Sequence, residues 1–457
     1  MDFTNSATTI LEWLKIAVDN TSNGKRVKER YMMNSSSWKV WYRPDCNIET
    51  AYAFLKAWEY TNDNAYLQLA RDIYSSIVKM QKADGSFPFA HTGDTHIYTN
   101  DNSEVPIFLF RMAEIDTEWA DTYRATALKG IDFILSIQNS NGSWRVVDND
   151  LHTPAMFTAH AVSGLATAYN YTTNKSGYKT AIEKGLDFIA TQILESGRVK
   201  CCYEINSGTE YWRPPSSDQA ICIRAFAHAE YYVTDSSRIN DWKTNRLKLL
   251  NWFNQLIDNS GAIKNGLGES INGADLAGLT DHVYTTAFGI EAYYWSYLVD
   301  NNNTYLDKAM AITNFSANNL YYSDDANANG VIRGAYNIQD DNWDTSSLIL
   351  NAGQEGGADM VYTGWVNAPL TALFFTLSNI NNYTCIMKVY DGSNIINIPI
   401  YEITEKANGC LRIYLNNKIN YIPLTEVDNK NASNIHIYVD DNIKAIKKIQ
   451  IANYERR

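Results

Sequence analysis

Cysteine is scarce in this sequence, and its few cysteines show no pairing pattern. Six cysteines are spread over 457 residues without C-x-x-C spacing. Domains held together by disulfides are richer in cysteine, and structural zinc sites use closely spaced pairs. The sequence therefore excludes a disulfide scaffold and a cysteine-based zinc site, and it predicts reduced thiols.

Long apolar runs are also absent. No stretch of 18 apolar residues occurs, and residues 1–4 begin the chain without the basic and apolar regions of a secretory signal. We therefore expect no membrane span. The expected location is the cytoplasm, or a virion from which the protein is released by lysis.

Positive charge is in short supply. The formal net charge is -12 and the pI is about 5.1, whereas nucleic-acid binding is built from clustered Lys and Arg. The sequence also lacks a phosphate-binding G-x-x-x-x-G-K-[ST] loop, a G-x-S-x-G nucleophile turn and H-E-x-x-H spacing. We expect neither a nucleic-acid partner, nor a cofactor, nor a metal.

Aromatic residues are abundant. The chain has 12 Trp, 31 Tyr and 15 Phe among many Asn and Asp residues. Aromatic faces stack on flat rings, and the amides and carboxylates beside them bind hydroxyl groups. This composition is typical of a surface that binds sugars, although many of these aromatics are expected in the core.

Two kinds of helical pattern alternate along most of the chain. Amphipathic segments with one charged face are expected to be outer helices, and more apolar segments are expected to be enclosed. The outer segments are 5–21, 63–82, 119–139, 177–195, 238–258 and 303–319. The inner segments are 47–60, 102–114, 153–170, 217–233, 281–298 and 359–377. Strict alternation predicts a mainly α protein, with an (α/α)6 barrel, or toroid, over residues 1–379.

Two outer segments end in turns of one style. Residues 81–87 and 138–144 share the spacing Q-x3-G-x-[FW]. This spacing resembles the QW motif of the terpene cyclase and α/α-toroid superfamily, which includes carbohydrate-active enzymes. The resemblance covers residues 1–378 as architecture and implies the toroid fold, but it does not specify an activity.

After residue 380 the pattern changes to β-type alternation. Tyr390, Tyr414 and Tyr438 recur at steps of 24 residues, and each is followed by a second apolar strand-like run. The sequence predicts a small β-repeat module over residues 380–457. This stretch resembles modules near the ends of phage tail and virion-associated proteins, which implies virion attachment or self-association. An ordinary accessory β-domain is the alternative.

Acidic side chains cluster where the inner helices are expected to begin, at one end of the barrel. Glycoside hydrolysis needs one carboxylic acid and one carboxylate, and we expect Glu104, Asp218 and Asp281 to supply them. The alternative is that each acid caps a helix. Residues expected to bind substrate are Trp41, Glu49, Asp101, His152, Trp212, Arg213, His282, Tyr284 and Tyr362. Trp343, amid acidic residues, is either a further sugar platform or a loop anchor.

The sequence therefore predicts a glycan-cleaving glycoside hydrolase that acts on a polysaccharide or oligosaccharide. The C-terminal resemblance adds the expectation that it is a virion-associated depolymerase of cell-surface glycans. A polysaccharide lyase with a Tyr or His base is a second hypothesis, although an acidic ring would repel a uronate polymer. A non-catalytic glycan-binding or structural virion protein is a third. A terpene cyclase is disfavoured because the D-x-D-D motif is absent and the helix starts are polar.

Overall fold

The computed structural model describes most of the chain. The described residues are 2–148, 150, 152, 154–200, 215–268, 270–271, 274–275, 278–344, 358–382 and seven strands within 386–451. The chain divides into two compact units, Phe3–Phe375 and Thr376–Arg457 with Met1–Asp2. The larger unit contains the residues of the candidate site.

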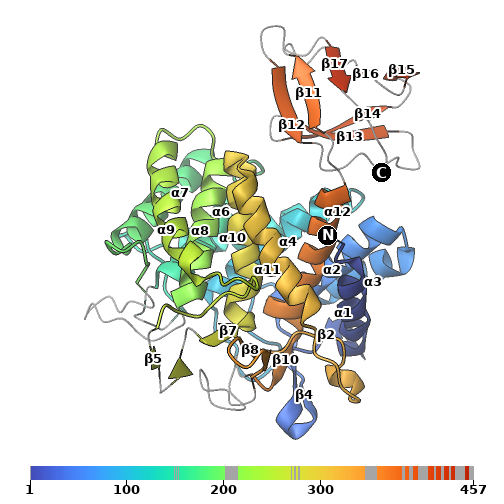
Figure 1. Ribbon diagram of the computed structural model, residues 1–457, viewed down its shortest axis with the longest axis vertical. Helices are drawn as coiled ribbons and strands as arrows, with labels where there is room; N and C mark the ends of the chain where they lie inside the picture. The colour runs from blue at the N-terminus through green and yellow to red at the C-terminus, as the bar shows by residue number, and fades with distance from the viewer. Residues whose placement is uncertain are drawn as a thin grey trace. The chain divides into compact units, whose positions relative to one another are not determined.

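The larger unit is a double ring of helices (Figure 1). The outer helices are α1 (Thr4–Ala17), α3 (Asn64–Ile77), α5 (Ala120–Ser136), α7 (Lys175–Thr191), α9 (Ile239–Phe253) and α11 (Asn303–Asn318). The inner helices are α2 (Pro44–Thr61), α4 (Thr99–Ile115), α6 (Ala155–Ala168), α8 (Pro215–Tyr232), α10 (Ala287–Asp300) and α12 (Ala368–Asn382). Helix α6 is buried along its whole length, and α1 contacts α11, so that the outer ring closes. The predicted (α/α)6 barrel is confirmed.

Glycine turns that follow the outer helices pack against the next outer helix. Gly85 and Gly142 have φ values of +99° and +90°, and a Cβ at either would lie 2.1 or 2.3 Å from a carbonyl oxygen of the next outer helix. The Gln81 side chain donates to the Gly85 and Thr126 carbonyls, and Gln138 donates to those of Gly142 and Ala181. The two QW-like turns therefore tie consecutive outer helices together.

Side-chain amides near the inner-helix starts hold the segments that follow these turns. The Asn102 amide accepts from the Phe87 N–H at 2.6 Å and donates to the Phe87 carbonyl at 2.9 Å. Asn47 makes the same pair of bonds to Val27, and Asn367 makes them to Ile332. We call Asn47, Asn102 and Asn367 the amide clamps. Buried backbone groups need such partners, so these polar helix-start residues serve the fold.

The last two inner helices begin later than the sequence predicts. Strand β7 (Leu279–Asp281) and a π-helical turn at His282–Thr286 precede α10. Strand β10 (Met360–Tyr362) and a kinked turn at Thr363–Asn367 precede α12. The predicted starts at 281 and 359 were wrong because the backbone groups of these strands bond to other strands.

Small antiparallel sheets contain these strands. Strand β3 (Arg30–Met32) pairs with β10 on one side and β4 (Ser37–Lys39) on the other. Strand β8 (Ala335–Asn337) pairs with β7 and with β9 (Asn342–Trp343). Strands β1 (Val18–Thr21) and β2 (Gly24–Val27) form a hairpin, as do β5 (Ser270–Ile271) and β6 (Ala274–Asp275). In Figure 1, β7, β8 and β10 lie at one end of the barrel.

The C-terminal unit contains the expected strand pairs. Strands β11 (Ile386–Tyr390) and β12 (Ile395–Pro399) form one hairpin, and β13 (Cys410–Leu415) and β14 (Lys418–Pro423) form another. Strand β16 (Asn434–Ile437) pairs with β17 (Lys448–Ile451) and with β15 (Val427–Asn431), which was not predicted. Tyr438 lies outside the described residues. No described helix is long and apolar enough to cross a membrane.

Candidate functional site

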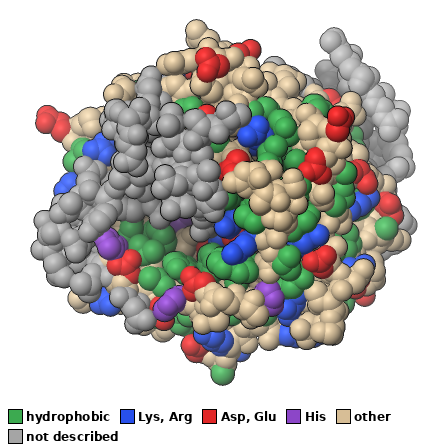
Figure 2. Space-filling model, turned by 90° about the horizontal axis from the view of Figure 1, so that it is seen from below, with side chains coloured by type: hydrophobic (Ala, Val, Ile, Leu, Met, Phe, Trp, Pro, Cys, Tyr) green, Lys and Arg blue, Asp and Glu red, His purple; other side chains and the backbone are tan. Residues whose placement is uncertain are grey.

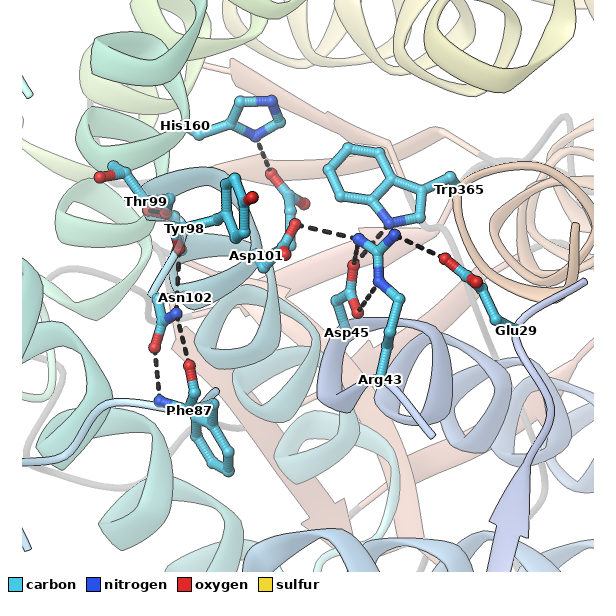
Figure 3. Close-up of polar contacts among 12 residues, drawn as sticks. Glu29, Arg43, Asp45, Phe87, Tyr98, Thr99, Asp101, Asn102, His160 and Trp365 are labelled. Atoms are coloured by element: carbon cyan, nitrogen blue, oxygen red, sulfur yellow. Dashed lines mark hydrogen bonds and ion pairs between the residues drawn. The ribbon is translucent and has the colours of Figure 1, made fainter. Parts of the chain in front are cut away.

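Arg43, directly before α2, is the centre of a buried cluster of charges (Figure 3). Its guanidinium donates to Asp45 at 2.6 Å, to Glu29 at 3.0 Å and to Asp101 at 3.2 Å. Arg30 pairs with the other oxygen of Glu29 at 2.5 Å. Three carboxylates therefore surround two guanidinium groups. Asp45 and Asp101 both accept a hydrogen bond from the same Arg43 nitrogen, so their two carboxylates lie close together.

Trp365 lies beside this cluster in a strained conformation. Its φ is +61°, which is rare for a bulky residue. Its indole N–H donates to Asp45 at 2.6 Å and its backbone N–H donates to Glu49 at 2.5 Å. The Arg43 guanidinium lies 5.9 Å from its ring centroid. A strained backbone conformation of this kind persists only where surrounding contacts hold it in place, and such residues often lie at functional sites.

Glu49 is a buried acid that contacts Trp365. Its side chain is buried, and burial followed by the nearby charge of Asp45 raises its pKa well above the ordinary value. Glu49 therefore holds its proton to a higher pH than an ordinary glutamate does. We call Arg43, Asp45, Glu49, Asp101 and Trp365 the tryptophan cluster.

A second buried network crosses the inner helices next to this cluster. Glu104 bonds to His160 Nδ1 at 2.5 Å and pairs with Arg224. Arg224 also donates to Glu291 at 2.8 Å, and Arg111 pairs with the other Glu291 oxygen at 2.5 Å. Burial opposes the charge on Glu104, but Arg224 and then His160 hold its pKa well below the ordinary range. Glu104 is therefore ionised and orients the His160 ring, whose centroid lies 6.0 Å from that of Trp365.

The other two acids predicted as catalytic lie at the starts of neighbouring inner segments. Asp281 is buried and its Oδ1 accepts the Val283 N–H at 2.9 Å, which is a capping bond. Asp218 is buried at the start of α8 and accepts from the Ser217 hydroxyl at 3.5 Å. The structure does not place these two acids in the tryptophan cluster with Glu49 and Asp101.

Three predicted substrate-binding residues are half-buried. Trp41 packs edge-on against Phe89, with ring centroids 5.7 Å apart, and the Lys39 ammonium lies 3.8 Å from its ring centroid. His152 bonds to Asp150 through Nδ1, and Tyr284 lies in the π-helical turn before α10. The side chains of these three residues are partly exposed.

Two further predicted substrate-binding residues are buried, as the members of the tryptophan cluster are. His282 is 1% exposed and bonds to the Thr286 hydroxyl at 2.8 Å, and burial lowers its pKa to about 3. Tyr362 is 1% exposed, and the Arg30 guanidinium lies 5.4 Å from its ring. Trp212 and Arg213 lie outside the described residues.

Figure 2 views the molecule from the end where β10 and β7 lie. Hydrophobic side chains there are interspersed with acidic, basic and histidine side chains. Within the described residues, no group of three His, Cys, Asp or Glu side chains is placed to hold a metal ion.

Sequence reasoning missed Trp365, as it missed His160 and Arg224 of the second network. The position of Trp365 depends on Gly364, because a Cβ there would lie 2.5 Å from the Cys46 Cα and 2.7 Å from the Glu49 carboxylate. The available signal was a Gly-Trp pair directly before the sixth inner helix, where a glycine allows close approach of two backbones.

Solved structures share the fold at low sequence identity. An α-1,6-mannanase of glycoside hydrolase family 76 from Salegentibacter sp. HEL1_6 is 12% identical, with a TM-score of 0.57 over 82% of this chain and 98% of that chain. A variant of it substituted at two adjacent aspartates is described as inactive. A cellobiose 2-epimerase from Bacillus thermoamylovorans B4167 is 11% identical, with a TM-score of 0.60 over 82% of this chain and 98% of that chain.

A sugar epimerase from a ruminal bacterium is 12% identical, with a TM-score of 0.62 over 82% of this chain and 98% of that chain. No protein-family model and no curated protein sequence matches the chain. These likenesses establish the toroid fold, and they give no support to the resemblance of the C-terminal strands to virion modules.

Proposed function

We propose that the protein is a carbohydrate-active enzyme, and that it is a glycoside hydrolase whose substrate binds at the tryptophan cluster. The observation that carries this proposal is Trp365, which is held by bonds to Asp45 and Glu49. An indole fixed among carboxylates and a guanidinium combines the stacking face and the hydroxyl partners that a sugar ring requires.

The charges of the cluster suit an uncharged glycan. Asp45, Asp101 and Glu29 are balanced only in part by Arg30 and Arg43, so a uronate would be repelled. When Glu49 carries its proton, it can donate to a sugar oxygen. The fold neighbours named as mannanases and epimerases add support, since those proteins are named for activities on sugars.

The test is the release of reducing ends from a panel of neutral, amino and acidic glycans. We expect the wild-type protein to cleave a glycan without charged carboxylates. Replacing Trp365 with Ala should lower kcat/KM at least about tenfold, because the stacking face is lost. Tyr322→Ala is the control, since Tyr322 is 65% exposed on the surface. Wild-type protein that cleaves no glycan, or a Trp365→Ala variant with full activity, contradicts the proposal.

A second candidate function is sugar epimerisation or isomerisation, and the Glu104–His160 pair favours it. An imidazole oriented by a carboxylate can remove a proton from the carbon next to a carbonyl of an open-chain sugar. Returning a proton from solvent would leave deuterium on carbon when the reaction runs in D2O. Sugar recovered with carbon-bound deuterium, lost in His160→Asn, would support this candidate, whereas hydrolysis leaves the carbon-bound hydrogens in place.

The polysaccharide lyase and the virion-associated role remain hypotheses. A lyase would create unsaturated ends that absorb ultraviolet light on a uronate polymer. The acidic surplus around Arg43 argues against such a substrate.

A further inference from the structure

Asp281 and Asp344 lie on one face of the β7–β8–β9 sheet, on either side of Ala335. Asp281 is the direct partner of Ala335 across β7 and β8. The Asp344 N–H donates to the Ala335 carbonyl at 3.2 Å, which continues the pairing of β8 with β9. Directly paired residues of neighbouring strands project from the same face. The three residues therefore form a row across the sheet.

The opposite face of this sheet packs against the helical wall. His282, Tyr336 and Trp343 project there, and Tyr336 contacts Phe315 of the outer helix α11 with ring centroids 5.3 Å apart. The row is thus turned away from α11. Its members are buried nevertheless, since Asp281, Ala335 and Asp344 are 1%, 4% and 5% exposed.

The spacing within the row has a chemical meaning. Two strand spacings separate Asp281 from Asp344, which is about 10 Å between their Cα atoms. Inverting glycoside hydrolases hold their two carboxyl groups about 6.5–9.5 Å apart, whereas retaining enzymes need about 5–5.5 Å. Ala335 lies between Asp281 and Asp344 in this row, and its side chain is a single methyl group.

Asp359 supplies an independent sign of a ligand near this row. It is 9% exposed, and neither carboxylate oxygen has a hydrogen-bond partner among the described residues. The adjacent Arg333, two residues before Ala335, donates to the carbonyls of Asp344 and Ala358. A buried carboxylate without a donor is costly unless a ligand supplies one. A sugar hydroxyl is such a donor.

Adjacent aspartates are the residues substituted in the inactive Salegentibacter variant, and no such pair is buried in the part of this chain that the structure describes. They occur at 324–325, 340–341 and 440–441. Asp340 and Asp341 are exposed, and Asp325 bonds to Tyr31 and caps Asn327. The pair 440–441 lies outside the described residues.

We propose that Asp281 and Asp344 are the base and the acid of an inverting glycoside hydrolase, and that Asp359 accepts a hydroxyl of the bound sugar. Asp281 takes a proton from water, whose oxygen attacks the anomeric carbon. Asp344 gives its proton to the leaving oxygen as the glycosidic C–O bond breaks. The bond from the Val283 N–H holds the Asp281 carboxylate in place, and Asp281 is assigned as the base. This inference rests on the proposed function.

The experiment compares Asp281→Asn and Asp344→Asn on a cleaved glycan and on an aryl glycoside with a good leaving group. Both variants should lose about 10²–10⁴-fold in kcat on the glycan. Only Asp344→Asn should recover on the aryl glycoside, because that leaving group needs no proton. Asp340→Asn is the control, because Asp340 is exposed in the turn between β8 and β9. This variant should keep full activity. Circular dichroism checks folding of every variant.

The configuration of the first product, read by proton NMR, gives a second readout that no folding defect can imitate. Inversion is expected. A retained configuration in the wild-type product, or full activity of both variants on the glycan, overturns the acid–base assignment while the hydrolase stands. Wild-type protein that releases no reducing ends from any glycan overturns the hydrolase itself and this inference with it.

Discussion

Gly364 allows the chain before α12 to pass against α2, and its replacement should have a defined cost. In Gly364→Ala the new Cβ would press on the Cys46 backbone and on the Glu49 carboxylate. We expect a loss of about 1–3 kcal/mol in the free energy of unfolding, because neither neighbour can move freely. Urea unfolding followed by circular dichroism measures this loss.

Gly278→Ala is the matched control for that substitution. A Cβ at Gly278 would meet only the flexible Gln339 side chain, at 2.9–3.3 Å. This variant should unfold within about 0.5 kcal/mol of the wild type. Equal losses in both variants would show that close packing of Gly364 on α2 is not the cause.

His282 should make stability depend on pH. Its folded-state pKa of about 3 lies below the ordinary value of 6.5, so the unfolded chain binds the proton more readily. The stabilising contribution is therefore complete above pH 6.5 and declines as pH falls toward 3. Between pH 6.5 and pH 5 it should shrink by about 2 kcal/mol.

Unfolding of wild type and His282→Asn at both pH values isolates this contribution, since the variant should lose less stability on acidification. His96→Asn is the control because the His96 side chain is exposed. Identical pH slopes for all three proteins would exclude a buried neutral His282.

At the residue scale, the sequence predicted which polar side chains gather at one end of the barrel but not their roles. Glu49 and Asp101 were expected to bind substrate, and they do lie together around Arg43 and Trp365. Trp365 was missed because its left-handed backbone conformation results from packing against α2, which no local pattern encodes. The ion pair between Glu104 and Arg224, 120 residues away, is equally invisible in the sequence.

At the element scale, the amide clamps make the inner-helix starts depend on single side chains. In Asn102→Ala the Phe87 N–H and carbonyl and the Tyr98 carbonyl would all lose a bond. We expect a loss of about 2 kcal/mol or more in the free energy of unfolding. Thermal and urea unfolding measure it.

Asn100→Ala is the control for this variant, because the Asn100 Oδ1 has no hydrogen-bond partner in the described part of the chain. Its stability should stay close to that of the wild type. A clamp variant as stable as this control would mean that water replaces the amide without cost.

Helices and strands differed in how well the sequence predicted them. Each helix closes its hydrogen bonds locally, so alternating wet and enclosed patterns located all the helices of the barrel. Strands β3 and β10 are paired across more than 300 residues, as in Met32 with Met360, and no local pattern reports such a partner. The boundaries at α10 and α12 failed for this reason.

At the scale of the whole molecule, the barrel should fold without the C-terminal strands. The compact unit Phe3–Phe375 contains helices α1 to α11 and residues 368–375 of α12. A chain ending at residue 382 keeps all of α12. We expect it to show cooperative thermal unfolding and the helical circular dichroism of the full chain.

The full-length protein is the control for this truncation. Loss of cooperative unfolding in the shorter chain would show that the barrel depends on the strands that follow it. Retained folding with weaker binding to a polymeric glycan would assign those strands a role in substrate capture.

The amide clamps also bear on how this protein can diverge. Each clamp forms hydrogen bonds to backbone groups of its own repeat. Neighbouring positions on the same helix start are therefore not needed for those bonds. Asp45 and Glu49 flank the clamp Asn47, and Asp101 and Glu104 flank the clamp Asn102. Mutations at the flanking positions can therefore change the chemistry at the mouth of the barrel while its architecture is inherited intact, which makes the toroid an evolvable scaffold.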